Sequence, residues 1–318
     1  MFFFEGSEKK FEFFSENNNL NFLEYPVSFW ESLVKHSNAQ ILSHIETPLL
    51  KAFLLSESSL FVWQKRILMI TCGTTTLGRA AEFLLNTFKE ESLSIEDFIF
   101  IRKNEYFSSL QQSSFQEDQT NLKKYLNGSS WQIGTLDLHH QLIFSSQKKL
   151  PQEYLAPTLE ILSYHPKESL VEQMENPSVH KKDFYRSWEP FSFYKNFTFD
   201  DFVFSPTGYS LNGIWQDFYI TLHITPQKNF SYISFETNYC SLDILKNFTS
   251  AWYHFLYPMS FDLISYNIPE DSLPLVGPEY SVTQQSKGIL PSGHNLSFKQ
   301  FNKINLPPLD LQPIFFEQ

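Results

Sequence analysis

A serine and a cysteine stand close together at the open end of one expected hairpin. The segment 59–71 reads as two strands joined by the two-residue turn Gln64-Lys65. If the turn has only these two residues, Ser58 lies opposite Thr71 and Cys72 lies diagonally across from Ser58, within the roughly 5–8 Å that separates cross-strand neighbours. Because the turn contains no Gly or Asn, a register shifted by one or two residues is the alternative. A hydroxyl and a thiol at this spacing could do nucleophilic and acid–base chemistry. On spacing alone, a strand-end serine beside an ordinary buried cysteine remains the simpler interpretation.

His223 lies on the polar face of a second expected strand. In the segment 218–224, Tyr219, Thr221 and His223 share one face, and the residues between them are apolar. This position is compatible with a base that faces a pocket. A solvated histidine on a polar face is the simpler alternative.

The two strands belong to a strand–turn–strand–helix unit that occurs twice, at 59–88 and 218–255. Together with a helix at about 26–36, these units predict an α+β fold, a layered sandwich of two antiparallel sheets flanked by helices and built from two related halves. The junction is expected near 165–195, and the stretch from about Pro269 is expected to be irregular. The apolar helix faces are Phe29, Trp30, Leu33 and Val34 in the first helix, Leu77, Ala80, Ala81, Leu84 and Phe88 in the second, and Leu242, Leu245, Phe248, Trp252 and Phe255 in the third.

Composition excludes some classes of partner. The chain has 24 basic and 35 acidic residues and a formal net charge of −11, which argues against nucleic acid. Its two cysteines, Cys72 and Cys240, predict no disulfide framework and a reducing, cytoplasmic setting. The start has no basic region, and no segment approaches the roughly 18 apolar residues of a membrane span, so we expect neither a signal peptide nor a membrane partner.

Four motifs, in order along residues 3–250, resemble the eukaryotic S-adenosylmethionine decarboxylases. The resemblance implies decarboxylation of S-adenosyl-L-methionine to S-adenosylmethioninamine for spermidine and spermine biosynthesis, carried out by a single domain of residues 1–318. It leaves the oligomeric state open between a monomer and a homodimer. The motifs are Phe4-Glu-Gly-Ser-Glu-Lys9, Leu55-Ser-Glu-Ser-Ser59 with Thr71-Cys-Gly-Thr-Thr75, Phe204-Ser-Pro-Thr-Gly-Tyr-Ser-Leu-Asn-Gly213, and Leu222-His-Ile-Thr-Pro226 continuing into Phe230-Ser-Tyr-Ile-Ser-Phe-Glu-Thr-Asn238.

The resemblance further implies that the chain cuts itself between Glu57 and Ser58. The Ser58 hydroxyl attacks the carbonyl of Glu57, and the resulting ester eliminates once a base, matched here by His223, has removed the α-proton of residue 58. Residue 58 is left as a covalent pyruvoyl group, and the products are a beta chain, 1–57, and an alpha chain, 58–318. An oxyanion forms on the way, so strain and a nearby donor would help.

The pyruvoyl cofactor implies the roles of further residues. It binds the substrate amine as a Schiff base and accepts electrons as carbon dioxide leaves. Cys72 matches the family residue that returns a proton to the substrate, and a thiol with the usual pKa near 8.5 is protonated at neutral pH. Ser210 matches a residue that assists self-processing, and Glu5 and Glu8 match acidic residues that the family places near the active site.

Substrate binding is assigned to residues of the same motifs. Phe4 and Phe204 match the pair of rings that stacks on adenine, a contact of roughly 1–3 kcal/mol per face. The backbone at Leu55 and Glu57 is expected to read the adenine edge. The family's ribose-binding glutamate is Gln227 here, whose neutral amide accepts hydrogen bonds more weakly than a carboxylate.

An acidic cluster that binds putrescine in many animal and fungal relatives is kept only in part. An aspartate two residues before Thr158 is replaced by Ala156, and a lysine before the Thr-Cys-Gly motif by Ile70. Because buried charges tolerate few unpaired members, we expect weak or absent stimulation by putrescine. The retained positions of this remnant are Glu12, Thr158, Glu160 and Glu236.

Two alternatives to an active decarboxylase remain at this stage. The substitutions Gln227 and Ala156 and a divergent C-terminal part would also fit a catalytically weak paralogue that regulates an active partner. A plain adenosine-binding protein would keep the aromatic pair but would not need Glu57-Ser58. No metal site is expected for any of the three.

Overall fold

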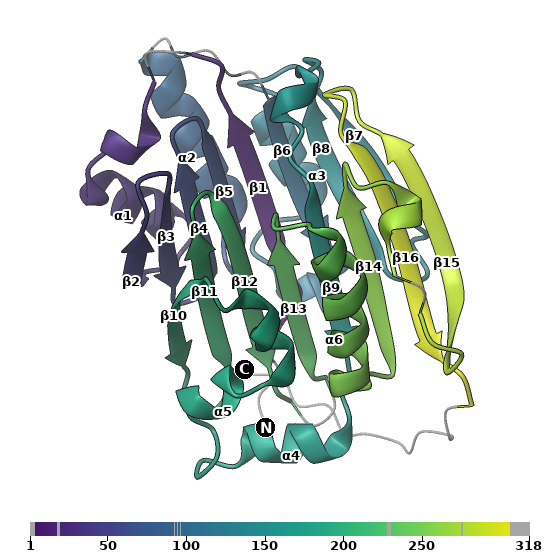
Figure 1. Ribbon diagram of the computed structural model, residues 1–318. Coiled ribbons are helices and arrows are strands. Elements are labelled where there is room, and N and C mark those ends of the chain that lie inside the picture. The colour runs from purple at the N-terminus through teal and green to yellow at the C-terminus, as the bar shows by residue number, and fades with distance from the viewer. Residues whose placement is uncertain are drawn as a thin grey trace.

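A strand with apolar residues on both faces must be buried on both sides. In this chain one face of each sheet packs against the other sheet, and helices pack against the outer face (Figure 1). The computed structural model describes residues 4–305 apart from residues 18, 19, 92, 94, 96, 228, 229 and 275. In it, two eight-stranded antiparallel sheets lie face to face, with helices over their outer faces (Figure 1). The predicted fold class is confirmed.

Sheet A is formed by the first part of the chain and sheet B by the second. The strands of sheet A are β1 (Lys9–Phe14), β2 (Ile41–Glu46), β3 (Leu50–Leu55), β4 (Ser58–Trp63), β5 (Arg66–Thr71), β6 (Asp97–Lys103), β7 (Gly128–Gly134) and β8 (His140–Ser146). Those of sheet B are β9 (Thr158–Tyr164), β10 (Thr198–Val203), β11 (Tyr209–Trp215), β12 (Phe218–Thr225), β13 (Tyr232–Thr237), β14 (Ser260–Tyr266), β15 (Tyr280–Ile289) and β16 (Asn295–Lys303).

The two sheets have the same topology. Sheet A has the order β2-β3-β4-β5-β1-β6-β8-β7, and sheet B has the order β10-β11-β12-β13-β9-β14-β16-β15, so each strand of sheet A has a counterpart eight strands later. The predicted two related halves are therefore confirmed. Their junction is not where we expected it: β9 already belongs to sheet B, so the halves meet at 147–157 and not at 165–195.

Helices cover the outer face of each sheet. On sheet A they are α1 (Val27–His36), α2 (Leu77–Glu90) and α3 (Phe115–Leu122). On sheet B, a π-helical turn (Ile244–Phe248) and α6 (Thr249–Leu256) lie over the face, and α4 (Glu168–Glu175) and α5 (Lys182–Arg186) lie toward the lower end of the sheet in the view of Figure 1. The apolar stripes predicted for α1 and α2 are buried except for the half-buried Phe29, whereas Leu242, predicted to be buried, is 64% exposed. In the ranges described here, none of the helices combines the length and the apolar character that crossing a membrane requires.

The stretch from Pro269 is more regular than we predicted. Its strands β15 and β16 form a long hairpin that pairs with β14 and completes sheet B. The prediction of an irregular tail was wrong because β15 is an edge strand with mostly exposed, polar residues, and such a strand has no apolar alternation to detect. Residues 306–318, the end of the tail whose role the sequence left open, lie outside the described residues.

Candidate functional site

The Glu57–Ser58 peptide lies at the tight turn between β3 and β4. Leu55 pairs with Ser58, so Ser56 and Glu57 form the turn. Ser58 has a φ of 125°, in a region that residues other than glycine rarely adopt. By strict alternation Ser58 would share the face of Leu60, which packs under the helices of sheet A. The distorted backbone instead lets the Ser58 hydroxyl reach between the sheets.

The carbonyl of Glu57 is held by Cys72. The predicted register is confirmed, since Ser58 pairs with Thr71 across β4 and β5. Cys72, the next residue, donates its backbone N–H to the Glu57 carbonyl oxygen at 3.1 Å. Its thiol points at the same oxygen, at 3.7 Å, and burial raises the pKa of the thiol well above its ordinary value. The thiol is therefore protonated at neutral pH.

His223 reaches Ser58 from the opposite sheet. Its Nε2 lies 2.9 Å from the Ser58 hydroxyl, and its Nδ1 lies 2.9 Å from the hydroxyl of Ser210. Burial lowers the pKa of His223 to about 4, although the charge of Glu8 acts in the opposite direction. The imidazole is therefore neutral at physiological pH and can accept a proton. A solvated histidine is excluded, because His223 is only 5% exposed.

Three neighbouring polar side chains were not predicted from the sequence. Ser59 donates to Asn212 Oδ1 at 2.6 Å, and Asn212 in turn donates to the backbone carbonyl of Phe53 at 3.1 Å. Thr221 lies 2.8 Å from His223 Nε2. The Ser59 hydroxyl also lies 3.3 Å from His223 Nε2, but its shortest hydrogen bond goes to Asn212, whereas the Ser58 hydroxyl lies 2.9 Å from that nitrogen, so the two adjacent serines are not equivalent. The signal was present in the sequence, since an asparagine and a threonine in two adjacent buried strands, β11 and β12, need polar partners.

Ser58, Cys72 and His223 border a cavity of about 770 Å³. Phe4 and Phe204 lie on its wall, and Phe4 is 39% exposed. Gly73 has a φ of 65°, and a Cβ there would lie 3.2 Å from the Phe4 ring. The absence of a side chain at Gly73 therefore leaves space for the ring in its observed position. The cavity thus brings together eight residues predicted for the site, namely Phe4, Glu57, Ser58, Cys72, Phe204, Ser210, His223 and Gln227.

Gln227 is occupied by the backbone of Phe4. The Phe4 N–H donates to Gln227 Oε1 at 2.9 Å, and Gln227 Nε2 donates to the Phe4 carbonyl at 2.8 Å. The amide therefore holds the aromatic residue in place.

Three predicted residues lie outside the cavity wall. Glu5 accepts backbone N–H groups of Ser7 and Phe107, at 3.2 and 3.1 Å, and burial raises its pKa to about 7 despite these bonds. The Leu55 side chain is fully buried in the core under the helices, so only its backbone is near the turn.

Glu8, the third of them, lies buried between the sheets. Burial alone would raise its pKa, but the Lys103 ammonium at 2.6 Å and the Ser234 hydroxyl at 2.5 Å hold it below the ordinary value. Glu8 is thus an anion whose charge is felt by His223.

The acidic cluster deeper between the sheets contains a cation that the sequence analysis overlooked. The Lys10 ammonium forms ion pairs with Glu160 and, at 3.0 Å, with Glu236. In the register of β1 and β5, Lys10 lies directly opposite Ile70. A cation therefore enters the cluster from the neighbouring strand, beside Ile70, where the resemblance led us to expect a lysine.

The rest of the cluster leaves little space. Glu12 pairs with Arg66, and Thr158 and Ala156 line a cavity of about 10 Å³ together with Lys10. A volume of this size holds about one water molecule.

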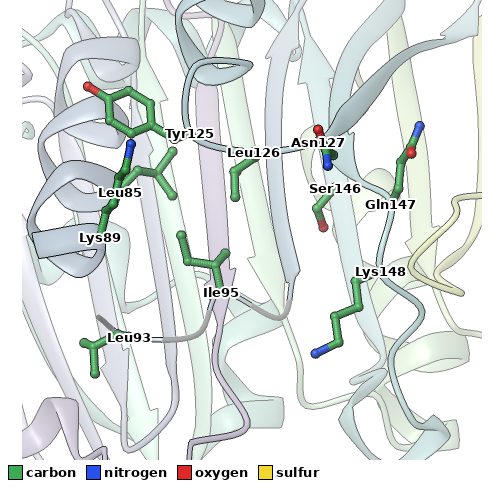
Figure 2. Close-up of a pocket in the computed structure, with 10 residues that line it drawn as sticks. All are labelled: Leu85, Lys89, Leu93, Ile95, Tyr125, Leu126, Asn127, Ser146, Gln147 and Lys148. Carbon is green, nitrogen blue, oxygen red and sulfur yellow. The ribbon is translucent and has the colours of Figure 1, made fainter. Parts of the chain in front are cut away.

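A separate hollow of about 530 Å³ lies on the helix side of sheet A (Figure 2). It is bordered by residues of α2, by Tyr125 to Asn127 and by the end of β8, with Lys89 over the Tyr125 ring (Figure 2). It shares no residue with the cavity at Ser58, so we assign it no part in the site.

Comparison with known proteins places this geometry in a family. The family model for adenosylmethionine decarboxylase matches residues 1–263. The S-adenosylmethionine decarboxylase proenzymes of Drosophila melanogaster and Xenopus laevis are 31% and 32% identical over 259 and 253 residues, and each alignment covers 74% of this chain and 75% of the relative. The proenzyme of Dictyostelium discoideum is 31% identical over 225 residues, or 67% of this chain, but the match spans only 58% of that longer protein.

The fold comparison agrees. The crystal structure of the Trypanosoma brucei AdoMetDC-delta26 monomer is similar over 77% of this chain and 98% of that one, with a TM-score of 0.58 at 20% identity, which is a likeness of fold. The chain belongs to the adenosylmethionine decarboxylase family.

Proposed function

We propose that this protein is a pyruvoyl-dependent S-adenosylmethionine decarboxylase that makes its own cofactor from Ser58. The observation that carries the proposal is the geometry at the Glu57–Ser58 peptide. Ser58 is strained, its hydroxyl lies 2.9 Å from a neutral His223, and the carbonyl that the hydroxyl would attack already accepts the Cys72 N–H. An inert strand end would require none of the three.

Self-processing follows from these contacts. As the Ser58 Oγ bonds to the Glu57 carbonyl carbon, its proton passes through His223 to the peptide nitrogen, and the C–N bond breaks to leave an ester. The Cys72 N–H stabilises the oxyanion formed on the way. A base then removes the α-proton of residue 58, the Cβ–Oγ bond breaks, and the Glu57 carboxylate departs. Water converts the remaining enamine into a ketone and releases ammonia.

The residues around Ser58 suit the group that this reaction produces. The pyruvoyl group supplies the electron sink for decarboxylation once it is formed. Cys72, beside residue 58, holds a proton on sulfur because burial raises its pKa, so it can deliver that proton to the substrate carbon. Glu8 keeps a negative charge near His223, and this charge favours any protonated state of the imidazole.

The cavity wall accounts for binding of the nucleoside. Phe4 and Phe204 border the same 770 Å³ space as Ser58, so a flat base between them can place its amino acid arm at residue 58. The turn residues Ser56 and Glu57 also line the space and offer backbone groups to the base. Gln227 contributes to nucleoside binding by holding Phe4 in place, because its amide hydrogen-bonds to the Phe4 backbone.

The biological setting is part of the same proposal. The product S-adenosylmethioninamine supplies aminopropyl groups for spermidine and spermine biosynthesis. We place the reaction in the cytoplasm, where the free thiol of Cys72 stays reduced. The enzyme would act as one domain of residues 1–318, cut into 1–57 and 58–318.

Electrophoresis and mass spectrometry of the purified protein test this function. We expect two fragments that correspond to 1–57 and 58–318, the larger beginning with a blocked pyruvoyl group, and release of carbon dioxide from S-adenosylmethionine. Ser58→Ala should abolish both. Ser59→Ala is the matched variant and should still be cut, because the Ser59 hydroxyl donates to Asn212 at 2.6 Å and lies farther from His223 than the Ser58 hydroxyl does. A single uncut band from the natural sequence would instead favour a regulatory paralogue.

A further inference from the structure

Glu175 ends helix α4 at the wall of the cavity that contains Ser58. Its Oε1 atom is buried, and within the described part of the chain no hydrogen-bond donor reaches it. Buried carboxylate oxygens are normally satisfied, so an oxygen in this state at a cavity wall indicates a donor that arrives with a ligand.

The position of Glu175 in its helix is unfavourable. The C-terminal end of a helix carries partial negative charge, which disfavours a carboxylate there, and the last turn of α4 contains no basic residue. The helix therefore gains nothing from this side chain. Glu172, on the same helix, is exposed to solvent, in contrast to the partly buried Glu175.

Gln227, the residue expected to bind ribose, has only part of its hydrogen-bonding capacity left for a ligand. Gln227 gives one lone pair and one N–H to the backbone of Phe4, and the amide oxygen has one lone pair left. A vicinal diol donates two hydrogen bonds, which a carboxylate accepts at its two oxygens. Another acceptor is therefore required.

The cavity has two carboxylates on its wall, Glu57 and Glu175. The Glu57 carboxylate lies beside Gly73 and the Phe4 ring, and among the described residues Glu175, not Glu57, has a buried oxygen without a hydrogen-bond partner. Glu175 lies toward the nucleoside end, because the segment after α4 is tied to Phe204: His180 Nε2 is 3.1 Å from the Phe204 carbonyl, and Pro177 shares the wall with that ring. Ribose is attached directly to the base that the ring would stack on.

We propose that Glu175 accepts hydrogen bonds from the ribose hydroxyls of the substrate and so determines affinity for the ribonucleoside. This inference depends on one part of the proposed function, namely that the substrate is a nucleoside, and it does not depend on decarboxylation. The role is one of binding: because Glu175 lies on the Phe204 side of the cavity, its replacement should raise KM and leave kcat unchanged.

Binding of a neutral nucleoside tests the proposal. The probe is 5′-methylthioadenosine, which has the ribose diol but neither a sulfonium charge nor an amino acid, and its 2′,3′-dideoxy analogue is the comparison ligand. By isothermal calorimetry, Glu175→Gln and Glu175→Ala should each bind the diol ligand about tenfold more weakly than the natural sequence, as expected for loss of a charge-assisted bond. The dideoxy analogue should bind the natural sequence and both variants with the same, weaker affinity.

Glu172→Gln is the matched control on the same helix and should leave both affinities unchanged. Equal affinities of Glu175→Gln and the natural sequence for the diol ligand would overturn the proposal. So would a parallel loss for both ligands, which would make Glu175 a packing residue. Decarboxylation is not needed for this measurement. A protein that prefers the diol ligand but releases no carbon dioxide would refute the proposed function and leave this inference intact.

Discussion

Cys72 contributes two different groups to the site, and one substitution separates them. Its backbone N–H lies on the Glu57 carbonyl, while its thiol is the proton donor proposed for the substrate carbon. Cys72→Ala keeps the backbone N–H and removes the thiol. We expect cutting at Glu57–Ser58 to persist and carbon dioxide release per cut chain to fall by roughly 10²-fold or more, the scale of a lost general acid.

Gel densitometry and a radiolabel assay on the same sample measure both quantities. Loss of cutting in Cys72→Ala would show that the thiol, and not the backbone N–H, assists the first step. Cys240→Ala serves as the control, because that residue is half-buried in the sheet B core and far from the cavity lining.

His223 should stay neutral through the physiological range. Burial lowers its pKa to about 4, so the ring is unprotonated above that pH and gains a proton only as the pH falls through it. The rate of cutting should therefore not decline between pH 8 and pH 6. In the uncut Ser58→Ala protein, the ¹⁵N shifts of the His223 ring should titrate with a midpoint near 4. A midpoint at the ordinary value of about 6.5 would contradict a buried neutral base.

Lys10 explains in physical terms why putrescine should have little effect on this enzyme. Its ammonium already pairs with Glu160 and Glu236, and the adjoining cavity of about 10 Å³ has no room for a diamine. We expect millimolar putrescine to leave the rate of the natural sequence unchanged. Lys10→Met removes the ion pair of Glu236 and one of two ion pairs of Glu160, which keeps Lys103 at 3.5 Å, at a cost of roughly 3–5 kcal/mol.

Putrescine should then restore part of the activity lost in Lys10→Met, because the diamine can return the missing charge. Sodium chloride at equal ionic strength is the control and should not do so. A several-fold stimulation of the natural sequence, measured as initial rate, would show that Lys10 does not fill the diamine site.

At the scale of elements, helix α2 is the clearest case for a packing test. Leu84 is fully buried under this helix, so Leu84→Ala should lower the free energy of unfolding by roughly 2–5 kcal/mol. Leu242 makes a matched control, because it is 64% exposed and its replacement should change stability by about 0.5 kcal/mol or less. Urea unfolding followed by tryptophan fluorescence measures both. A comparable loss for Leu242→Ala would mean that its exposure is not maintained in solution.

The contrast between these two leucines shows what a sequence pattern can predict. The hairpin of β4 and β5 has the register expected for a two-residue turn, although a turn without Gly or Asn left a shift by one or two residues open. Leu242 fits an apolar stripe by spacing, but the segment that follows begins with a π-helical turn, which rotates the stripe. Lys10 was missed for a different reason: a charged residue inside an apolar strand is identified only by its partners, and these lie at Glu160 and Glu236, far along the chain.

At the scale of the whole molecule, the site depends on the pairing of the two halves. Ser58 begins β4 and His223 lies in β12, which is the counterpart of β4 in the second sheet. The proposed nucleophile and the proposed base therefore come from different halves. The sequence motifs could identify both residues, but their approach to 2.9 Å arises only when the sheets stack. The same stacking removes water from the histidine, and this burial is what lowers its pKa.

The topology also predicts that the two fragments of the cut chain stay together. Fragment 1–57 would contribute β1, β2 and β3, and β1 lies in the middle of sheet A, hydrogen-bonded to β5 on one side and β6 on the other. Cutting at the β3–β4 turn breaks a single peptide and leaves the ladders of β1 and of β3 with β4 in place. The cut protein should therefore elute from a native sizing column as one peak, at the volume of uncut Ser58→Ala, and separate into two bands only after denaturation. Release of the short fragment in native buffer would show that these ladders do not hold it, and the active site, which needs Phe4 from one fragment and His223 from the other, could not persist.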